Sequence, residues 1–207
     1  MNKYYTIQGE SESEFIINRS RFITTACHTE NMDEAREFIG IIKKKYSDAT
    51  HNCYAFISDK LGLEMRFSDD GEPGGTAGLP ILEVIKKKEL KEVTVVVTRY
   101  FGGIKLGAGG LVSAYTEGAV TCLDNAKIAK MVLSDVYELE LDYTLFSVAE
   151  KFLREKANVI NVEYNTNVKI TYSVESKNES INNSLLDLTN GKSNPVKIKE
   201  EYIDENN

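Results

Sequence analysis

The sequence predicts an α+β protein built from two small domains, residues 1–130 and 131–207. Strand-like and helix-like segments alternate along the chain, and from Ser134 a complete βαββαβ order starts afresh. The charge is divided as well: 17 Lys/Arg stand against 18 Asp/Glu in the first domain, and 8 against 14 in the second. With 42% hydrophobic residues, the chain can form two modest cores without disulfides or metals.

In the first domain, residues 20–27 are rich in β-branched and aromatic side chains and predict a strand. A helix is expected after Asn31, because Asn31 and Glu34 resemble a capping box and apolar residues then recur at helical spacing as far as Tyr46. Three lysines in its last turns, 43–45, suit the negative end of the helix dipole.

The remaining elements of this domain follow in order: strands at 52–57 and 63–67, a helix at 76–88, a strand at 93–97 and a helix at 111–123. In the second of these segments, Leu63, Met65 and Phe67 alternate with charged residues, which predicts a half-buried strand. The valine-rich segment 93–97 is the strongest strand signal in the chain and is expected to be buried.

The second domain is predicted to contain strands at 136–141, 159–164, 168–174 and 196–202 and helices at 145–156 and 179–188. The turn-prone segment 165–167 separates two of the strands, and Gly191 and Pro195 precede the last one. This βαββαβ order within about 70 residues is the ferredoxin-like arrangement.

Bulk properties exclude several classes of protein. No stretch approaches the roughly 18 apolar residues of a membrane helix, and the acidic N-terminal region does not resemble a secretion signal, so a cytoplasmic protein without membrane contact is expected. Cys27, Cys53 and Cys122 are odd in number and far apart, which predicts buried reduced thiols. At a net charge of −7, nucleic-acid binding would need a local basic cluster, and recognition of a DNA sequence is not expected.

Ten of the fourteen glycines fall between Gly71 and Gly118, and the first cluster lies in the loop 68–78. Three carboxylates share this loop: Asp69, Asp70 and Glu72. Together they could hold a hard cation such as Mg²⁺ or supply a general base, with Thr76 at the end of the loop as a ligand contact. The alternative is a turn whose acids cap the following helix and stay solvated, since aspartate is common in turns for local reasons.

The second glycine cluster, residues 98–111, lies between a strand and a helix, where free backbone N–H groups and the helix dipole favour an anion. Arg99 and Lys105 add positive charge, so a phosphate of a nucleotide or of RNA would suit this segment. The amides expected to contact the anion belong to Gly107, Gly109 and Gly110. The glycine spacing matches neither a Walker A loop nor a dinucleotide-binding loop, and close packing of helix on strand is the alternative reason for the glycines.

Three further residues border these loops. His51 could act as an acid or base, contact a phosphate or bind a metal, although a lone histidine is more often structural. Asn52 is placed with it at the rim of the anion site. Tyr100, with Phe101 beside it, could stack on a base, and burial in the core is the alternative.

Together these segments resemble the signature of the IMPACT family in its bacterial YigZ-type form. The match is carried by Asp48-Ala49-Thr50-His51-Asn52, by the loops 68–78 and 99–111 in the right order, and by Ser20-Arg21-Phe22. It spans residues 15–125 and departs only at Gly75, a less fixed position. The resemblance implies a first domain with the βα fold of the second domain of a small-subunit ribosomal protein. That fold is shared with domain IV of elongation factor G and with small-molecule kinases of the GHMP type. The second domain is expected to be similar to the ferredoxin-like domains of elongation factor G.

The same resemblance implies a role in translation. Eukaryotic members of the family regulate translation by competing for an activator of an amino-acid-starvation kinase. Bacterial members are expected to be translation regulators or nucleic-acid binders, with no settled catalytic activity. The leading hypothesis is therefore a non-catalytic regulator that binds RNA, the ribosome or a translation-linked protein through the glycine-rich anion site.

Two other hypotheses stay open. One is an enzyme that acts on a phosphorylated or nucleotide-like small molecule, with Mg²⁺ on the carboxylates of the first loop as its possible cofactor and His51 as the acid or base. The other is an interaction module that uses the acidic second domain as its docking surface. It leaves the glycine-rich loops unexplained.

Overall fold

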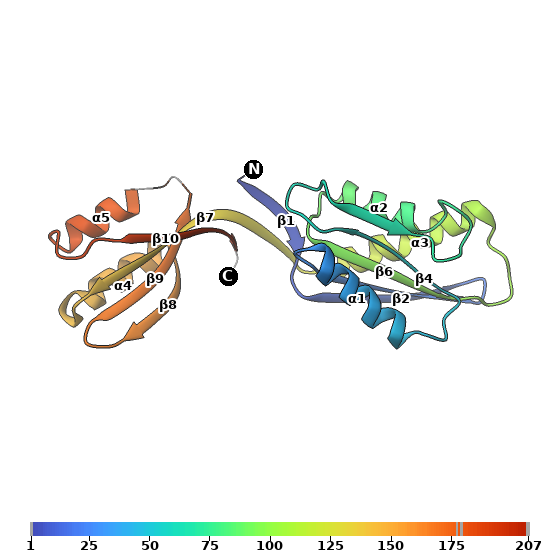
Figure 1. Ribbon diagram of the computed structural model, residues 1–207, viewed down its shortest axis with the longest axis horizontal. Coiled ribbons are helices and arrows are strands. Elements are labelled where there is room, and N and C mark those ends of the chain that lie inside the picture. The colour runs from blue at the N-terminus through green and yellow to red at the C-terminus, as the bar shows by residue number, and fades with distance from the viewer. Residues whose placement is uncertain (1, 177, 179, 206–207) are drawn as a thin grey trace. The chain divides into compact units, whose positions relative to one another are not determined.

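The computed structural model describes residues 2–176, 178 and 180–205, which fall into two compact units (Figure 1). One unit consists of residues 4–129, and the other contains the remaining described residues. Each unit combines helices with a β-sheet, so the predicted α+β fold class is confirmed.

The sheet of the first unit has the strand order β2-β3-β6-β4-β5, and its neighbouring strands are antiparallel. These strands are β2 (Glu10–Ile17), β3 (Ser20–His28), β4 (His51–Ile57), β5 (Met65–Ser68) and β6 (Val93–Tyr100). Helix α1 (Met32–Lys45) covers one face of the sheet, whereas α2 (Gly78–Lys87) and α3 (Gly107–Asn125) cover the other.

The valine-rich strand β6 lies in the middle of this sheet and is buried on both faces, as predicted. Its side chains alternate between two cores: Val95 and Val97 pack with α2 and α3, whereas Val96 packs beneath α1. Full burial of one such side chain stabilises the fold by about 1.5–3 kcal/mol. The same alternation continues to the end of the strand, where the side chain of Arg99 points to one face of the sheet and those of Thr98 and Tyr100 point to the other.

The predicted cap of α1 is confirmed. The Asn31 side chain accepts hydrogen bonds from the amides of Asp33 and Glu34, which have no partner within the helix. The carboxylate of Glu34 reaches back and accepts from the amide of Glu30. The helix therefore begins where the sequence places it.

The second unit has the predicted βαββαβ order, with a sheet order of β10-β7-β9-β8 and antiparallel pairs throughout this path. Its elements are β7 (Ile128–Leu141), α4 (Tyr143–Lys156), β8 (Asn158–Tyr164), β9 (Val168–Glu175), α5 (Ser180–Leu188) and β10 (Val196–Asp204). Strand β1 (Lys3–Ile7) also pairs with β7. The core of this unit contains the stacked rings of Tyr137 and Tyr172 and the side chain of Leu153 from α4. The predicted helix start, Glu179, lies outside the described residues.

The structure corrects three predictions. Strands β1 and β2 were missed, because β2 alternates charged or polar residues with half-buried ones and has no fully buried side chain. Leu63 and Phe67 are 76% and 47% exposed, since β5 is a four-residue strand at the sheet edge and begins after Leu63. Helix α3 begins at Gly107 rather than at Leu111, so the glycine run is part of the helix.

Within the described residues, no helix is long and apolar enough to cross a membrane. All three cysteines are free, with Cys53 and Cys122 buried and Cys27 half-buried. Burial raises the pKa of the Cys53 thiol to about 12, which makes it a structural rather than a reactive thiol.

The contact between α3 and the sheet depends on Gly118. A Cβ at this position would lie 2.7 Å from Thr24 Oγ1 and 3.4 Å from the Phe15 ring. Gly118→Ala is expected to lower the free energy of unfolding, because overpacking costs about 1–3 kcal/mol and the gain in helix propensity is at most about 1 kcal/mol. Gly40→Ala in α1 is the matched control, since a Cβ there meets nothing within 4 Å and should stabilise the helix. Urea unfolding measures both, and equal effects would contradict the packing argument.

Candidate functional site

The segments singled out in the sequence meet at one cavity of about 380 Å³ in the first unit. Its lining includes His51 from β4, Glu72 from the first glycine loop, Arg99 from the end of β6, and Lys105 and Gly107 from the second loop and the start of α3. Four separate stretches of the chain therefore contribute to one concave surface. The order of these segments along the chain does not predict that they meet. They meet because strand β4 pairs with strand β6.

The register of that pairing decides which side chains face the cavity. His51 lies opposite Arg99, so both project to the same face of the sheet. Asn52 lies opposite Thr98 and projects to the other face, where it accepts a hydrogen bond of 2.7 Å from the Thr98 hydroxyl. Tyr100, next to Arg99, also points away and donates to Asp48. Neither Asn52 nor Tyr100 lines the cavity, contrary to the prediction that placed them in one site with Arg99.

A buried ion pair forms the inner wall of the cavity. Arg99 Nη1 donates to Glu72 Oε1 over 2.6 Å, and the two side chains are 6% and 4% exposed. The Tyr115 hydroxyl of α3 donates to the same oxygen over 2.7 Å. Burial, followed by the neighbouring Cys53 and Glu72, holds the pKa of Tyr115 far above its usual range, so this hydroxyl stays a donor. Two donors on one carboxylate oxygen offset much of the cost of burying its charge.

The guanidinium of Arg99 also packs against two aromatic rings. Its centre lies 5.5 Å from the Phe22 ring and 5.3 Å from the Phe101 ring. Its Nη2 makes only a long contact of 3.5 Å with the Ser20 hydroxyl. Its Nε is buried and has no hydrogen-bond partner among the described residues. Arg99 therefore keeps unused donor capacity beside the cavity.

His51 is fixed in one tautomer by its surroundings. Its Nδ1 lies 2.8 Å from the carbonyl oxygen of Asp70, and because a carbonyl can only accept, Nδ1 carries the proton. In the neutral ring, Nε2 is then an acceptor, and it faces Glu72 Oε2 at 3.9 Å. This distance is too long for a direct hydrogen bond but allows a shared donor between the two atoms.

The three carboxylates of the first glycine loop do not converge. Asp69 accepts from the amides of Gly75, Ala77 and Gly78 and so caps the start of α2. Asp70 is bound by Lys43 of α1 and by the amide of Asn52, while Glu72 is bound by Arg99. No group of three potential metal ligands occurs in the described part of the chain. The predicted magnesium site on these three residues therefore lacks its geometry, and the capping alternative holds for Asp69.

Thr76 is likewise occupied within the protein. Its hydroxyl donates to the carbonyl oxygen of Pro73 over 2.6 Å, and the residue is 7% exposed. Thr76 closes the turn that leads into α2 and does not line the cavity. Its predicted role as a ligand contact has no geometric support.

The start of α3 forms the outer wall of the cavity. Gly107 enters the helix with a φ of 72°, a conformation that favours glycine. The preceding residue, Leu106, provides no side-chain cap, and the first turn contains no acidic residue. Gly107, Ala108 and Gly109 are exposed, so their first-turn amides can bind an external acceptor. Gly107 lines the cavity, whereas Gly109 and Gly110 lie in the same turn just outside it.

Two contributors to the site were missed in the sequence. Tyr115 falls within the helix expected at 111–123, and Ser20 belongs to an expected strand and to the family signature, but neither was proposed as a site residue. Ser20 Oγ accepts from the amide of Gly102 and contacts Arg99. A Cβ on Gly102 would lie 2.1 Å from the backbone of Arg19, so this glycine permits the close approach. A tyrosine on a buried helix face signals a polar partner inside the protein, and that was the clue available.

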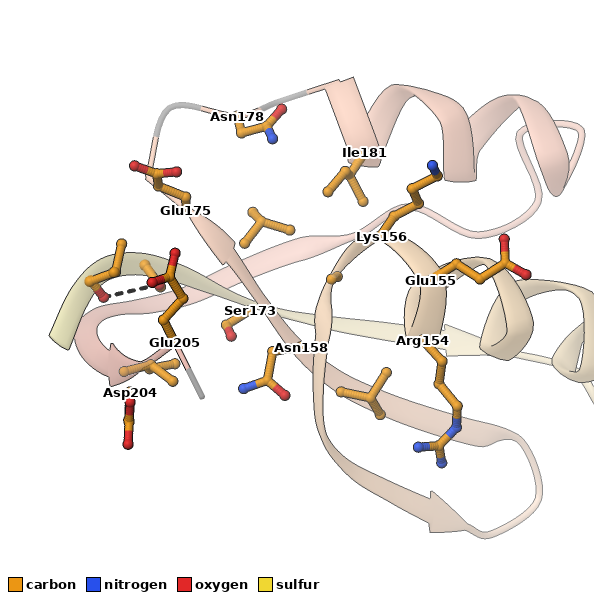
Figure 2. A pocket seen from close by; sticks show the side chains of 16 residues that line it. Arg154, Glu155, Lys156, Asn158, Ser173, Glu175, Asn178, Ile181, Asp204 and Glu205 are labelled. Atoms are coloured by element: carbon orange, nitrogen blue, oxygen red, sulfur yellow. Dashed lines mark hydrogen bonds between the residues drawn. The ribbon is translucent and has the colours of Figure 1, made fainter. Parts of the chain in front are cut away.

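A second concave region lies in the second unit and has a volume of about 670 Å³ (Figure 2). Glu175, Asp204 and Glu205 lie on one side of it, and Arg154 and Lys156 on the other. Glu155 also lines this region, so four carboxylates stand against two cations and the lining is acidic overall. None of its side-chain polar atoms is both buried and without a partner within the described residues, in contrast to Arg99 in the first cavity.

Two family models match the chain. The Impact N-terminal domain matches residues 18–123, and a domain of unknown function (DUF1949) matches residues 139–192. The IMPACT family member YvyE of Bacillus subtilis is 40% identical over 195 residues, which cover 93% of this chain and 90% of that protein. An IMPACT family member of Haemophilus influenzae is 34% identical over 196 residues, covering 93% and 95%.

Similarity extends to a eukaryotic protein and to a solved structure. Protein IMPACT of Mus musculus is 43% identical over 67 residues, which cover 31% of this chain and 20% of that protein. A solved structure described as the crystal structure of a hypothetical protein has a TM-score of 0.64 and 31% identity. It covers 97% of this chain and 100% of its own.

The ion pair can be tested by a double-mutant cycle. Arg99→Met and Glu72→Gln are each expected to lower the free energy of unfolding by about 3–5 kcal/mol, because each leaves a buried charge without its partner. The double variant should lose less than the sum of the two, with a coupling of about 0.5–3 kcal/mol. Urea unfolding gives all three values. Strictly additive losses would show that the two side chains do not interact in solution.

The cap formed by Asp69 predicts a pH dependence. Burial raises the pKa of Asp69, but the three amide donors outweigh it, so its pKa is lowered overall. The charged form is therefore favoured by folding, and its contribution is present above the unfolded pKa of about 3.9 and lost as the pH falls through the native value. Asp69→Asn should be less stable than wild type at pH 7, and the difference should shrink below about pH 4. Asp187→Asn, at an exposed position of α5, is the control; a constant difference for Asp69→Asn would contradict the assignment.

Proposed function

Because the chain belongs to the IMPACT family, we propose that it is a translation-associated regulator that binds phosphate groups of RNA at the cavity of its first unit. One observation carries this proposal. Helix α3 starts with glycines and without a capping side chain, next to Lys105 and the partly unsatisfied Arg99. A bound anion would supply the hydrogen-bond acceptors that the helix end lacks.

The charges of the cavity favour an anion of this kind. Glu72 is the only carboxylate in the described lining, and Arg99 neutralises it. Lys105 and the positive end of the helix dipole then remain in excess. The first domain is close to neutral overall, so the contact is local, and a few phosphates rather than a long stretch of RNA would be bound. A translation-linked protein that presents an acidic group is the alternative partner.

A second candidate function is supported by a different observation. His51 Nε2 and Glu72 Oε2 face each other at 3.9 Å inside a concave site, an arrangement that could accept a proton from a bound water or hydroxyl. This geometry favours an enzyme that acts on a phosphorylated or nucleotide-like small molecule. Magnesium, if it takes part, would have to be bound largely by the substrate, because the loop carboxylates are engaged elsewhere.

The proposal predicts opposite effects on stability and binding for one substitution. Gly109→Asp places a carboxylate in the first turn of α3, where a Cβ meets nothing within 4 Å. It should raise the free energy of unfolding by about 0.3–1 kcal/mol through the helix dipole. It should also weaken RNA binding by about tenfold or more, because a negative charge in the same turn as Gly107 repels the phosphate and competes with it for the first-turn amides. Fluorescence anisotropy with a labelled single-stranded RNA measures the affinity.

Gly109→Ala is the matched control, since it stabilises the helix without adding charge and should keep the affinity within about threefold. Lys105→Ala should reduce the slope of log affinity against log salt by about 0.7, the value of one phosphate contact, whereas Lys44→Ala on α1 should not. Unchanged RNA affinity in both Gly109→Asp and Lys105→Ala would refute the site. Stabilisation by Mg²⁺ with ATP or GTP, but no RNA binding, would favour the enzyme.

A further inference from the structure

We infer that the cavity binds the phosphomonoester of a terminal nucleotide, with its base on the Phe101 ring, rather than an internal phosphodiester. This inference rests on the proposed function and names the part of the ligand that enters the cavity. Two independent features point to a ligand here: the uncapped first turn of α3, and Arg99, whose side chain is 6% exposed and whose buried Nε has no partner among the described residues.

The number of available donors favours a monoester. The cavity offers the first-turn amides of α3, the ammonium group of Lys105 and the guanidinium of Arg99, which makes one short hydrogen bond to Glu72 and one long contact to Ser20. A phosphomonoester presents three terminal oxygens and a charge of about −1.5 to −2, whereas an internal diester presents two such oxygens and a single charge. Three separate sets of donors are therefore matched by the three oxygens of a monoester.

The depth of the site also favours a terminal phosphomonoester over an internal phosphodiester. The Arg99 guanidinium packs against Phe22 and Phe101, and its side chain is only 6% exposed, so a phosphate must enter the cavity to reach it. A volume of about 380 Å³ falls near the lower end of small-molecule sites, about 300–1,000 Å³. Such a volume suits a single nucleotide. An internal phosphodiester would require the strand to continue in two directions from the same point.

Phe101 provides a surface for the base. Its ring lies against Arg99 and is still 45% exposed, and its backbone amide is held by the Thr50 hydroxyl over 3.0 Å. The ring lines the cavity together with Pro73 and Leu106. An aromatic face held in place at the mouth of a phosphate site is suited to stacking on a base, and such stacking is tolerant of base identity.

The experiment compares one single-stranded RNA in three forms: with a 5′-phosphate, with a 3′-phosphate and with neither. Binding to the full chain is measured by isothermal titration calorimetry, with adenosine monophosphate and inorganic phosphate as competitors. A terminal phosphate is expected to raise the affinity by about tenfold or more, as charge-assisted hydrogen bonds do. Gly109→Asp should abolish this difference.

Phe101→Ala should weaken nucleotide binding by about fivefold or more while leaving inorganic phosphate binding unchanged. Phe67→Ala is the control, since Phe67 is similarly exposed, at 47%, and lies on β5 outside the cavity. Competition by adenosine monophosphate without any RNA binding would keep this inference, with a free nucleotide as the source, and would overturn the proposed RNA-binding function. Equal binding of all three RNA forms, still lost in Gly109→Asp, would overturn this inference and keep the proposed function.

Discussion

The buried pair of Arg99 and Glu72 is the interaction on which the rest of the site depends. A buried charge without a partner is strongly destabilising, so residues of the surrounding elements must form hydrogen bonds to both members of the pair. Tyr115 does so from α3, Ser20 from β3, and Glu72 itself comes from the first glycine loop. The pair thereby connects α3, through Tyr115, with the sheet and with the first glycine loop. The inner wall of the proposed anion site depends on this contact as well as on the glycines.

Much of the fold could be predicted from short-range patterns in the sequence. The capping box at Asn31, the valine run of β6 and the βαββαβ order of the second unit all depend on neighbouring residues. Strand β2 was not predicted, because its alternating side chains are half-buried rather than buried. The early start of α3 was also hidden, because glycine has a low intrinsic helix propensity. In both cases tertiary packing decides the structure and local preference does not.

The candidate site could be predicted in outline but not in detail, for a similar reason. Sequence reasoning brought His51, Glu72, Arg99 and Lys105 into consideration, and one cavity contains all four. It could not assign faces, because the two-residue period of a strand separates neighbours such as Arg99 and Tyr100 only once the register is known. It also could not foresee that Lys43, distant in sequence, would bind Asp70. The charge of a loop residue says little until its partner is known.

The glycine-rich beginning of α3 has a consequence for how this protein can change over generations. A helix end without a capping side chain, and with three glycines in its first four residues, forgoes stability that ordinary substitutions would restore. Serine before the helix, or an acidic residue within its first turn, would be an easy improvement in robustness. If these first-turn amides bind a ligand, each such substitution would occupy the amides that the ligand needs. Selection for thermal tolerance and selection for binding therefore act in opposite directions on the same few residues.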